Sequence, residues 1–282
     1  MAIKRIRGKR CLITGAASGI GRATALAAAA RGAELVLTDI DAEGLASAEQ
    51  EIVAAGGTVL HAGAADVSDH AAVVAFAEAV HAAHGSMDVV MNIAGVSAWG
   101  PVERLEHRHW QRMIDINLMG PIHVLECFAG PMVQAGRGGH IVNVSSAAGL
   151  FGLPWHAAYS ASKFGLRGIS EVLRFDLRRH GIGVSLVCPG AVKTPLVGTV
   201  EIVGVDRTSP SIAKTIARFE RHAVSPEHVA AKILTGIEKN QYMVFTSRDI
   251  RVGYFFQRKL AFPYELAMRR LNDHLVAVAE RG

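Results

Sequence analysis

A strand, a glycine-rich turn, a helix and a second strand follow one another near the start of the chain, and this order constrains the fold more than any other feature. Residues 10–14 form a short β-type run, and the turn T-G-A-A-S-G-I-G comes directly after it. Residues 19–31 are strong helix formers, and Gly32 is placed to end that helix as a C-cap. With E-L-V-L-T-D as the next strand, the order predicts a βαβ unit, a parallel sheet and a right-handed crossover.

The same alternation continues along the chain. We expect further helices at 41–55, 69–84, about 106–134, 156–180 and 226–239. We expect further strands at 57–61, 88–92, 139–145, 183–188 and 241–246. Ser225 and Pro226 suit the N-cap and first position of the last of these helices. The pattern predicts an α/β fold: a single doubly wound, Rossmann-type domain of about seven parallel strands with helices on both faces.

Composition and charge exclude several classes of protein. The chain has 282 residues, half of them hydrophobic, and a net charge of +5 that is scattered rather than gathered into a basic stripe, so no nucleic-acid partner is expected. The three cysteines lie far apart in apolar runs and have no metal-ligand spacing, which predicts reduced core residues, a cytoplasmic location and no metal. No targeting segment is apparent, and no apolar run is long enough to predict a transmembrane helix.

The glycine-rich turn is the first motif with chemical meaning. Gly15, Gly19 and Gly21 allow a tight turn, a close backbone approach to a pyrophosphate and an anion at a helix N-terminus. Asp39 ends the second strand, where its carboxylate can accept hydrogen bonds from ribose hydroxyls and would repel a 2′-phosphate. No Arg or Lys occupies positions 38–42. These residues favour NAD over NADP, and the alternative is that Asp39 only caps a helix.

Tyr159 and Lys163 are four residues apart in the 156–180 helix, so they lie on one face of it. An ammonium beside a phenol favours the phenolate, which predicts a lowered pKa for Tyr159 and a role as general acid/base. Ser146 follows a buried strand and can face the first turns of that helix across one cleft. The alternative, taken alone, is an ordinary Tyr and Lys on a helix surface.

Six segments occur in one order: residues 14–21, N-I-A-G at 92–95, Asn117, Ser146, Y-S-A-S-K at 159–163, and P-G-A-V-K-T at 189–194. Together they resemble the short-chain dehydrogenase/reductase family over residues 6–246. The resemblance implies NAD(P)-dependent oxidation or reduction at CH–OH groups. The cofactor contacts that it implies, apart from the three glycines and Asp39, are Ser18, Ile20, Asp66, Val67, Asn92, Ala94, Gly95, Tyr159, Lys163, Pro189, Gly190, Val192 and Thr194.

The resemblance also implies a catalytic role for four residues. Tyr159 would be the acid/base, Lys163 would lower its pKa and bind the nicotinamide ribose, and Ser146 would hold the substrate oxygen, with Ser145 as its rival. Asn117 would keep a water between Lys163 and solvent, and its alternative is a polar residue at a local helix kink. Ile93 departs from the family's second Asn, a mild change because that motif approaches the cofactor through its backbone.

Apolar residues dominate the segments that reach the carboxyl ends of the strands, and they predict a lipophilic secondary alcohol or ketone as substrate. The alternative is that these residues only close over the cofactor. They are Trp99, Leu150, Phe151, Leu153, Trp155, Leu196, Val197, Val200, Ile202 and Val203.

The expected boundaries are 1–249 for the dinucleotide-binding catalytic domain, with a substrate lid at about 191–224, and 250–282 for a C-terminal helical extension. The aromatic and basic extension would either pack against the lid or a neighbouring subunit, which we favour, or lie on a membrane surface. The family forms homodimers or homotetramers through helices that correspond to 106–134 and 156–180.

Three other functions fit part of the pattern. An NADP-dependent carbonyl reductase would share every catalytic residue. A non-catalytic dinucleotide sensor would keep the glycine-rich turn but has no reason to keep Asn117, Ser146, Tyr159 and Lys163 together. A methyltransferase would not need the Y-x-x-x-K spacing. A nicotinamide-dependent oxidoreductase acting on a small molecule explains all of the motifs.

Overall fold

The structure is a computed structural model that describes residues 3–195, 200–204, 221 and 223–279. Seven parallel strands form the central sheet in the order β3-β2-β1-β4-β6-β7-β9. Their bounds are β1 Arg10–Thr14, β2 Glu34–Asp39, β3 Thr58–Ala64, β4 Val89–Asn92, β6 Gly139–Val144, β7 Ile182–Cys188 and β9 Met243–Phe245. The chain reverses its direction of travel across the sheet between β1 and β4, and in this topology ligands bind at that point.

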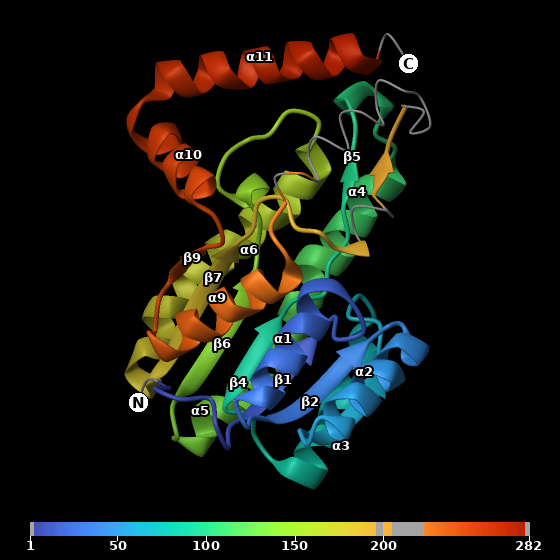
Figure 1. Cartoon of the computed structure of the whole chain (residues 1–282), viewed down its shortest axis with the longest axis vertical. Coiled ribbons are helices and arrows are strands. Elements are labelled where there is room, and N and C mark those ends of the chain that lie inside the picture. The colour runs from blue at the N-terminus through green and yellow to red at the C-terminus, as the bar shows by residue number, and fades with distance from the viewer. Residues whose placement is uncertain (1–2, 196–199, 205–220, 222, 280–282) are drawn as a thin grey trace.

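Helices cover both faces of the sheet (Figure 1). Their bounds are α1 Gly19–Ala30, α2 Ala42–Ala54, α3 His70–His84, α4 His107–Ile114, α5 Gly120–Ala135, α6 Ala157–Asp176 and α9 Pro226–Glu238. One apolar cluster joins the sheet to α1, α2 and α9, and a second joins it to α3 and α5. Neighbouring residues of one strand enter opposite clusters, as Leu12 and Ile13 do, because side chains alternate along a strand.

The fold confirms the predicted doubly wound α/β architecture, with three differences in its elements. The helix expected at about 106–134 is divided: a π-helical turn, Asp115–Met119, lies between α4 and α5. β9 is shorter than the strand expected at 241–246. A small second sheet, which the sequence pattern did not predict, pairs β5 (Ala98–Trp99) with β8 (Glu201–Ile202).

Two helix ends form as the local sequence predicts. The Ser225 side chain accepts a hydrogen bond from the backbone N–H of His228 (3.2 Å), and Pro226 begins α9. Gly32 has a left-handed φ of 78° just after α1, and its N–H donates to the carbonyl of Ala29 (2.8 Å). Only a residue that tolerates positive φ can end the helix in this way.

The residues after β9 form two further helices, α10 (Arg248–Lys259) and α11 (Ala261–Ala279). In Figure 1 they lie in red at one end of the molecule, beyond the carboxyl ends of the central strands. The helical break falls at Leu260, and Pro263 is accommodated in the first turn of α11, where its missing N–H is not needed.

One helical stretch among the described residues, His107–Ala135, is long and apolar enough to span a membrane by length and composition alone. Core helices of soluble proteins pass the same test. Phe128 and Met132 of this stretch are buried against the sheet, which explains its hydropathy by packing within the fold.

Candidate active site

The glycine-rich turn is so tightly packed that Gly15 and Gly21 leave no room for a side chain. A Cβ on Gly21 would lie 1.8 Å from the carbonyl oxygen of Gly15, and one on Gly15 would lie 2.8 Å from the Cα of Ala94. Gly15 also has a φ of 71°. The Thr14 hydroxyl accepts hydrogen bonds from the backbone N–H groups of Ile93 and Ala94 (3.0 and 3.1 Å), which joins the turn to the end of β4. The backbone of the glycine-rich turn therefore meets the backbone after β4 at the sheet edge, between the two strands where the strand order reverses.

The P-G-A-V-K-T segment crosses in front of this turn. Thr194 lies beside Gly19, because a Cβ on that glycine would be 3.2 Å from the Thr194 Cγ2. Pro189 accepts a hydrogen bond from Ala147 N (2.8 Å), and Val192 is buried and bridged to Val224. The start of the predicted lid thus joins the glycine-rich turn to the loop that follows Ser146. The lid positions 196–199, 205–220 and 222, including Leu196 and Val197, lie outside the described residues.

Asp39 lies at the carboxyl end of β2, beside the turn. Its Oδ2 accepts a hydrogen bond from Ala17 N (2.9 Å) and its Oδ1 accepts one from Asp41 N (3.0 Å). The alternative that Asp39 caps the following helix is wrong, since Asp41 is the N-cap of α2 and accepts from Gly44 N (3.0 Å). Asp39 is therefore a half-buried carboxylate beside the N-terminal end of α1, and it does not serve as a helix cap.

Asp66 and Val67 lie next to Asp39, because Ala65 N–H donates to the Asp39 carbonyl (3.0 Å). The Asp66 Oδ1 accepts from both Ser68 N and Ser68 Oγ, at 2.8 and 2.7 Å. Val67 is buried against Gly120. Ser18 is the N-cap residue of α1, with no hydrogen bond from its side chain to the helix, and the half-buried Ile20 packs against the core.

The Asn92 side chain does not face the cofactor region. It is buried and donates to the Asn143 Oδ1 on the neighbouring strand (2.9 Å), and Asn143 in turn donates to Ser170 Oγ (2.9 Å). Asn92 therefore fastens β4 to β6. Two residues after Ile93 the chain reaches Gly95, where a Cβ would lie 2.9 Å from Asn117 Oδ1 and 3.4 Å from Lys163 Nζ. A glycine here keeps open a space that borders both side chains.

Asn117 is completely buried in the π-helical turn. Its Oδ1 accepts from Val96 N and its Nδ2 donates to Val96 O, both at 2.9 Å. The extra residue of a π turn rotates the helix locally, and such turns are frequent at functional sites. The two interpretations of Asn117 are compatible, because it lies at a helix irregularity and also beside Lys163.

Ser146, Tyr159 and Lys163 come together at the carboxyl end of β6. Tyr159 is hydrogen-bonded to Ser146, and Lys163 Nζ lies 5.8 Å from the centroid of the Tyr159 ring and donates to Val144 O (3.0 Å). The rival Ser145 is buried, and its hydroxyl donates to the Lys163 carbonyl (3.0 Å). Of the two serines, Ser146 is the one whose hydroxyl contacts Tyr159.

The pKa values of the pair differ from the expectation. Burial raises the pKa of Tyr159, and the hydrogen bond from Ser146 opposes that rise. Burial also lowers the pKa of Lys163 to about 8. Burial outweighs the groups that lower the pKa of Tyr159 in the protein alone, and the lowering of that pKa by Lys163 stays a prediction. The spacing in sequence placed the two groups on one face correctly, but it contained no information on how far burial removes both from water.

One aromatic residue beside Tyr159, His156, was not identified from the sequence. The ring centroid of His156 lies 6.3 Å from that of Tyr159 and 4.7 Å from that of Trp99. His156 precedes Tyr159 by three residues, a spacing that places side chains on one helix face and could have identified it. The preceding residue, Trp155, has a φ of 67°, which is unusual for a large side chain and marks a constrained loop.

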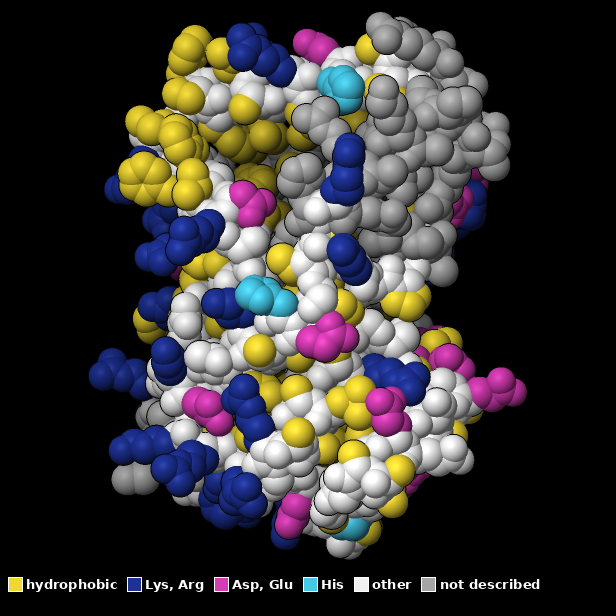
Figure 2. Space-filling model, in the orientation of Figure 1, with side chains coloured by type: hydrophobic (Ala, Val, Ile, Leu, Met, Phe, Trp, Pro, Cys, Tyr) yellow, Lys and Arg dark blue, Asp and Glu magenta, His cyan; other side chains and the backbone are white. Residues whose placement is uncertain are grey.

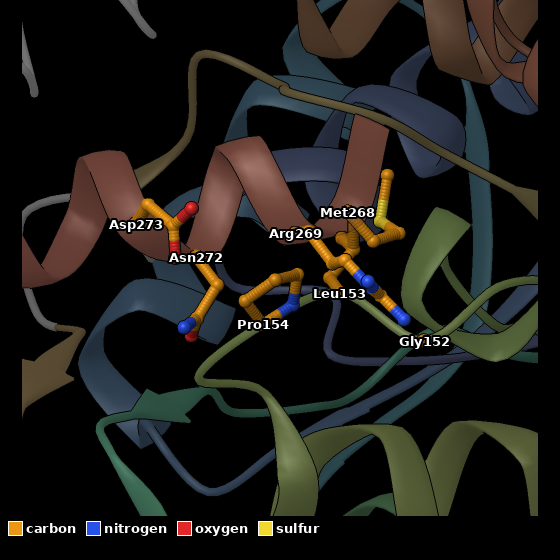
Figure 3. A pocket seen from close by; sticks show the side chains of 7 residues that line it. All are labelled: Gly152, Leu153, Pro154, Met268, Arg269, Asn272 and Asp273. Atoms are coloured by element: carbon orange, nitrogen blue, oxygen red, sulfur yellow. The ribbon is translucent and has the colours of Figure 1, made fainter. Parts of the chain in front are cut away.

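The predicted apolar wall divides into two groups. Trp99, Leu153, Trp155, Ile202 and Val203 are half-buried, and Val200 is buried. Leu150 and Phe151 are also buried, but in a core cluster with Ile250 of α10, so the prediction that they face the substrate is wrong. Leu153 and Pro154 line a cavity of about 560 Å³ together with residues of α11 (Figure 3).

Comparisons with known proteins agree with this geometry. The sequence pattern of the short chain dehydrogenase family matches residues 9–202. The chain belongs to this family. Over 264 residues it is 36% identical to a Mycobacterium tuberculosis protein named as the putative oxidoreductase SadH, covering 92% of this chain and 93% of the relative.

Solved structures of the family superpose on this one. A short-chain dehydrogenase/reductase from Burkholderia phymatum in complex with NAD has a TM-score of 0.82 and 31% identity, covering 90% of this chain and 94% of the other. A metagenomic short-chain oxidoreductase in complex with NADP has a TM-score of 0.67 and 36% identity, covering 85% and 96%. This chain is an NAD(P)-dependent oxidoreductase acting on CH–OH groups. The turn positions where only glycine fits, Gly15 and Gly21, suit the close approach of a nicotinamide dinucleotide.

Proposed function

We propose that this enzyme transfers a hydride between NAD and a lipophilic secondary alcohol or the corresponding ketone, with Tyr159 as the acid/base. The observation that carries the proposal is the contact of the Ser146 hydroxyl with the Tyr159 phenol, next to the buried Lys163 ammonium. These three groups can exchange a proton with one substrate oxygen and stabilise charge on it.

When bound, the nicotinamide supplies the hydride acceptor for oxidation and the hydride donor for reduction. In oxidation, Tyr159 first releases its own proton toward Lys163. The carbinol C–H electron pair would then leave as hydride while the hydroxyl proton passes to the Tyr159 phenolate, which gives a ketone. Ser146 donates a hydrogen bond to the reacting oxygen and so holds it beside the phenol. The space at Gly95 that borders Asn117 and Lys163 supports a proton route from Tyr159 through Lys163 toward solvent.

Asp39 supports NAD as the preferred cofactor. Its carboxylate is half-buried at the end of β2 and is already fixed by two backbone N–H groups. A 2′-phosphate placed beside it would meet a like charge, whereas ribose hydroxyls would meet acceptors. The glycine-rich turn would hold the pyrophosphate, and Val192 and Thr194 would meet the carboxamide.

The half-buried Trp99, Leu153 and Trp155 support a lipophilic substrate, because they bring apolar surface to the catalytic edge with little charge. We expect bulky hydrophobic secondary alcohols to be oxidised faster than sugars or short polyols.

We also propose that the protein acts as a homodimer or homotetramer.

The test uses two variants, Asp39→Ala in a cofactor titration and Tyr159→Phe in a turnover assay. Tryptophan fluorescence should show NAD binding at least about tenfold more tightly than NADP, with most of that preference lost in Asp39→Ala. Tyr159→Phe should lower kcat by about 10²- to 10⁴-fold and leave NAD binding nearly unchanged, because only the acid/base oxygen is removed. Tighter binding of NADP would refute the cofactor assignment, and a fully active Tyr159→Phe would refute the mechanism.

A further inference from the structure

We propose that His156 accepts a hydrogen bond from a donor group on the substrate, placed next to the carbon that reacts. The inference rests on the proposed function and narrows its substrate class to lipophilic secondary alcohols with a neighbouring hydroxyl, such as aryl vicinal diols, and to the α-hydroxy ketones that their oxidation gives. The residue is a substrate-binding and specificity-determining group in addition to Ser146 and Tyr159.

His156 is placed to touch a substrate that reacts at Tyr159. It is the N-cap residue of α6, three residues before Tyr159, and the two ring centroids are 6.3 Å apart. It is half-buried at the end of the loop that begins at Ser146. A molecule with one oxygen between Ser146 and Tyr159 therefore presents its adjacent atoms to the imidazole.

The hydrogen bonds of the ring determine which nitrogen carries the proton. Nδ1 lies 2.7 Å from the carbonyl oxygen of Pro154, and a carbonyl can only accept, so Nδ1 is the protonated nitrogen. Burial lowers the pKa of His156, which keeps the ring neutral near pH 7. In this tautomer Nε2 is an acceptor, and among the described residues it has no hydrogen-bond partner.

The ring is also held in place from outside its own helix. It stacks against Trp99, with centroids 4.7 Å apart, and the Trp99 indole N–H donates to Ser97 Oγ (2.6 Å). The backbone around it is fixed as well, since Gly100 N donates to Trp155 O (2.8 Å) and His156 N donates to Leu153 O (3.2 Å). An acceptor fixed in this way loses little conformational freedom when it binds a ligand.

The identity of Nε2 as an acceptor decides which substrates fit. A hydroxyl or N–H beside the reacting carbon can donate to it. A methyl ether at the same position has no hydrogen to donate. The oxygen lone pairs of a carboxylate or a second carbonyl would face the lone pair of Nε2, and the two acceptors would repel each other. The adjacent Trp99 and Trp155 provide apolar surface for the remainder of the molecule.

The experiment compares three alcohols with NAD as oxidant and NADH formation as the readout: 1-phenyl-1,2-ethanediol, 1-phenylethanol and 2-methoxy-1-phenylethanol. The wild-type enzyme should oxidise the diol with a kcat/KM about tenfold above either analogue, the effect of one hydrogen bond. In His156→Phe, which keeps a flat ring against Trp99, the three values should become similar. His156→Gln, which restores an acceptor, should recover part of the preference.

The outcomes separate the two proposals. If wild-type enzyme oxidises all three alcohols equally well, the role of His156 is wrong while the proposed function stands, and this comparison needs no variant to fold. If His156→Phe keeps the full preference for the diol, another group supplies the acceptor and the inference is again wrong. If the wild-type enzyme oxidises none of the three, the proposed substrate class fails and this inference fails with it.

Discussion

Lys163 is a residue whose burial reduces the stability of the fold. Its side chain is only 4% exposed, and Nζ donates to a backbone carbonyl, that of Val144. Burial lowers its pKa from 10.5 to about 8, which corresponds to about 3 kcal/mol of unfavourable free energy for the charged form in the folded state. The proposed proton route gives a reason for a charged group in this position.

The direction of the pH dependence follows from the two pKa values. Between pH 8 and 10.5 the unfolded state binds more protons than the folded state, so the free energy of unfolding rises with pH in that window. Below pH 8 both states are charged and the penalty is present in full. Lys163→Met should therefore be more stable than wild type by about 2 kcal/mol at pH 7, after loss of the bond to Val144 is subtracted. Urea unfolding at pH 7 and pH 10 measures this difference.

The gain from Lys163→Met should shrink at pH 10, and the variant should be inactive. Lys232→Met is the matched control, because Lys232 is exposed on α9 and its replacement should change stability by less than about 0.5 kcal/mol at either pH. If the Lys163→Met variant is less stable than wild type at pH 7, the ammonium stabilises the fold and the argument from burial is wrong.

At the scale of single residues, sequence reasoning located the reacting groups but not their protonation. The spacing of the motifs placed Ser146, Tyr159 and Lys163 in one cleft, and the resemblance to the family favoured Ser146 over Ser145. In the structure, the Ser145 hydroxyl is bonded to the backbone of Lys163 instead. Their pKa shifts come from burial by segments that are distant in sequence, and helix spacing has no access to that quantity.

At the scale of elements, the C-terminal extension is attached to the loop between Ser146 and Tyr159. The Tyr264 hydroxyl accepts a hydrogen bond from Gly152 N (3.0 Å) and donates one to Gly152 O (3.3 Å). Phe151 packs beneath Gly253 of α10, and Ile250 joins the same cluster. The extension thus contacts the loop after Ser146, a segment other than the lid or neighbouring subunit that the sequence suggested, and α11 also lines the neighbouring cavity (Figure 3).

Removal of the Tyr264 hydroxyl should loosen this loop. We expect Tyr264→Phe to lower kcat/KM about tenfold, since two hydrogen bonds that position the loop are lost while the ring remains packed. Tyr254→Phe is the control: that hydroxyl bonds to Arg167 and Arg258 rather than to the loop, so its loss should change kcat/KM less. Steady-state kinetics and melting temperatures of both variants check this. Equal kinetic effects in the two variants would argue against a specific role for Tyr264.

The sequence predicted the type of almost every central element, because βαβ alternation and glycine placement are local signals. The π-helical turn at Asn117 was not predictable from periodicity, since Asp115–Met119 continues the apolar pattern of the flanking helices. The pairing of β5 with β8 was also missed, because each strand has two residues and the pairing connects segments that are about a hundred positions apart in sequence.

At the scale of the whole molecule, the described residues form two exposed apolar surfaces. One lies on α6 and includes Phe164, Val172 and Phe175, which are 39%, 57% and 61% exposed. The other lies over α10 and the start of α11, where Figure 2 shows hydrophobic side chains gathered at the upper left. Its members include Val252, Phe255, Phe256, Leu260 and Phe262. Contiguous exposed apolar surface of this kind marks interfaces with proteins or membranes.

The α6 surface is the one that we expect to join two subunits, because its apolar residues recur along one long helix and a two-fold axis can pair that surface with itself. Phe175→Glu should place two like charges in such an interface and shift the protein to monomers in sedimentation velocity experiments. Val53→Glu is the control, since Val53 is 56% exposed on α2, far along the chain from this face, and should leave the assembly intact. If Phe255→Glu separates the subunits and Phe175→Glu does not, assembly occurs through the C-terminal extension, and the second apolar surface is then the subunit interface rather than a membrane-binding face.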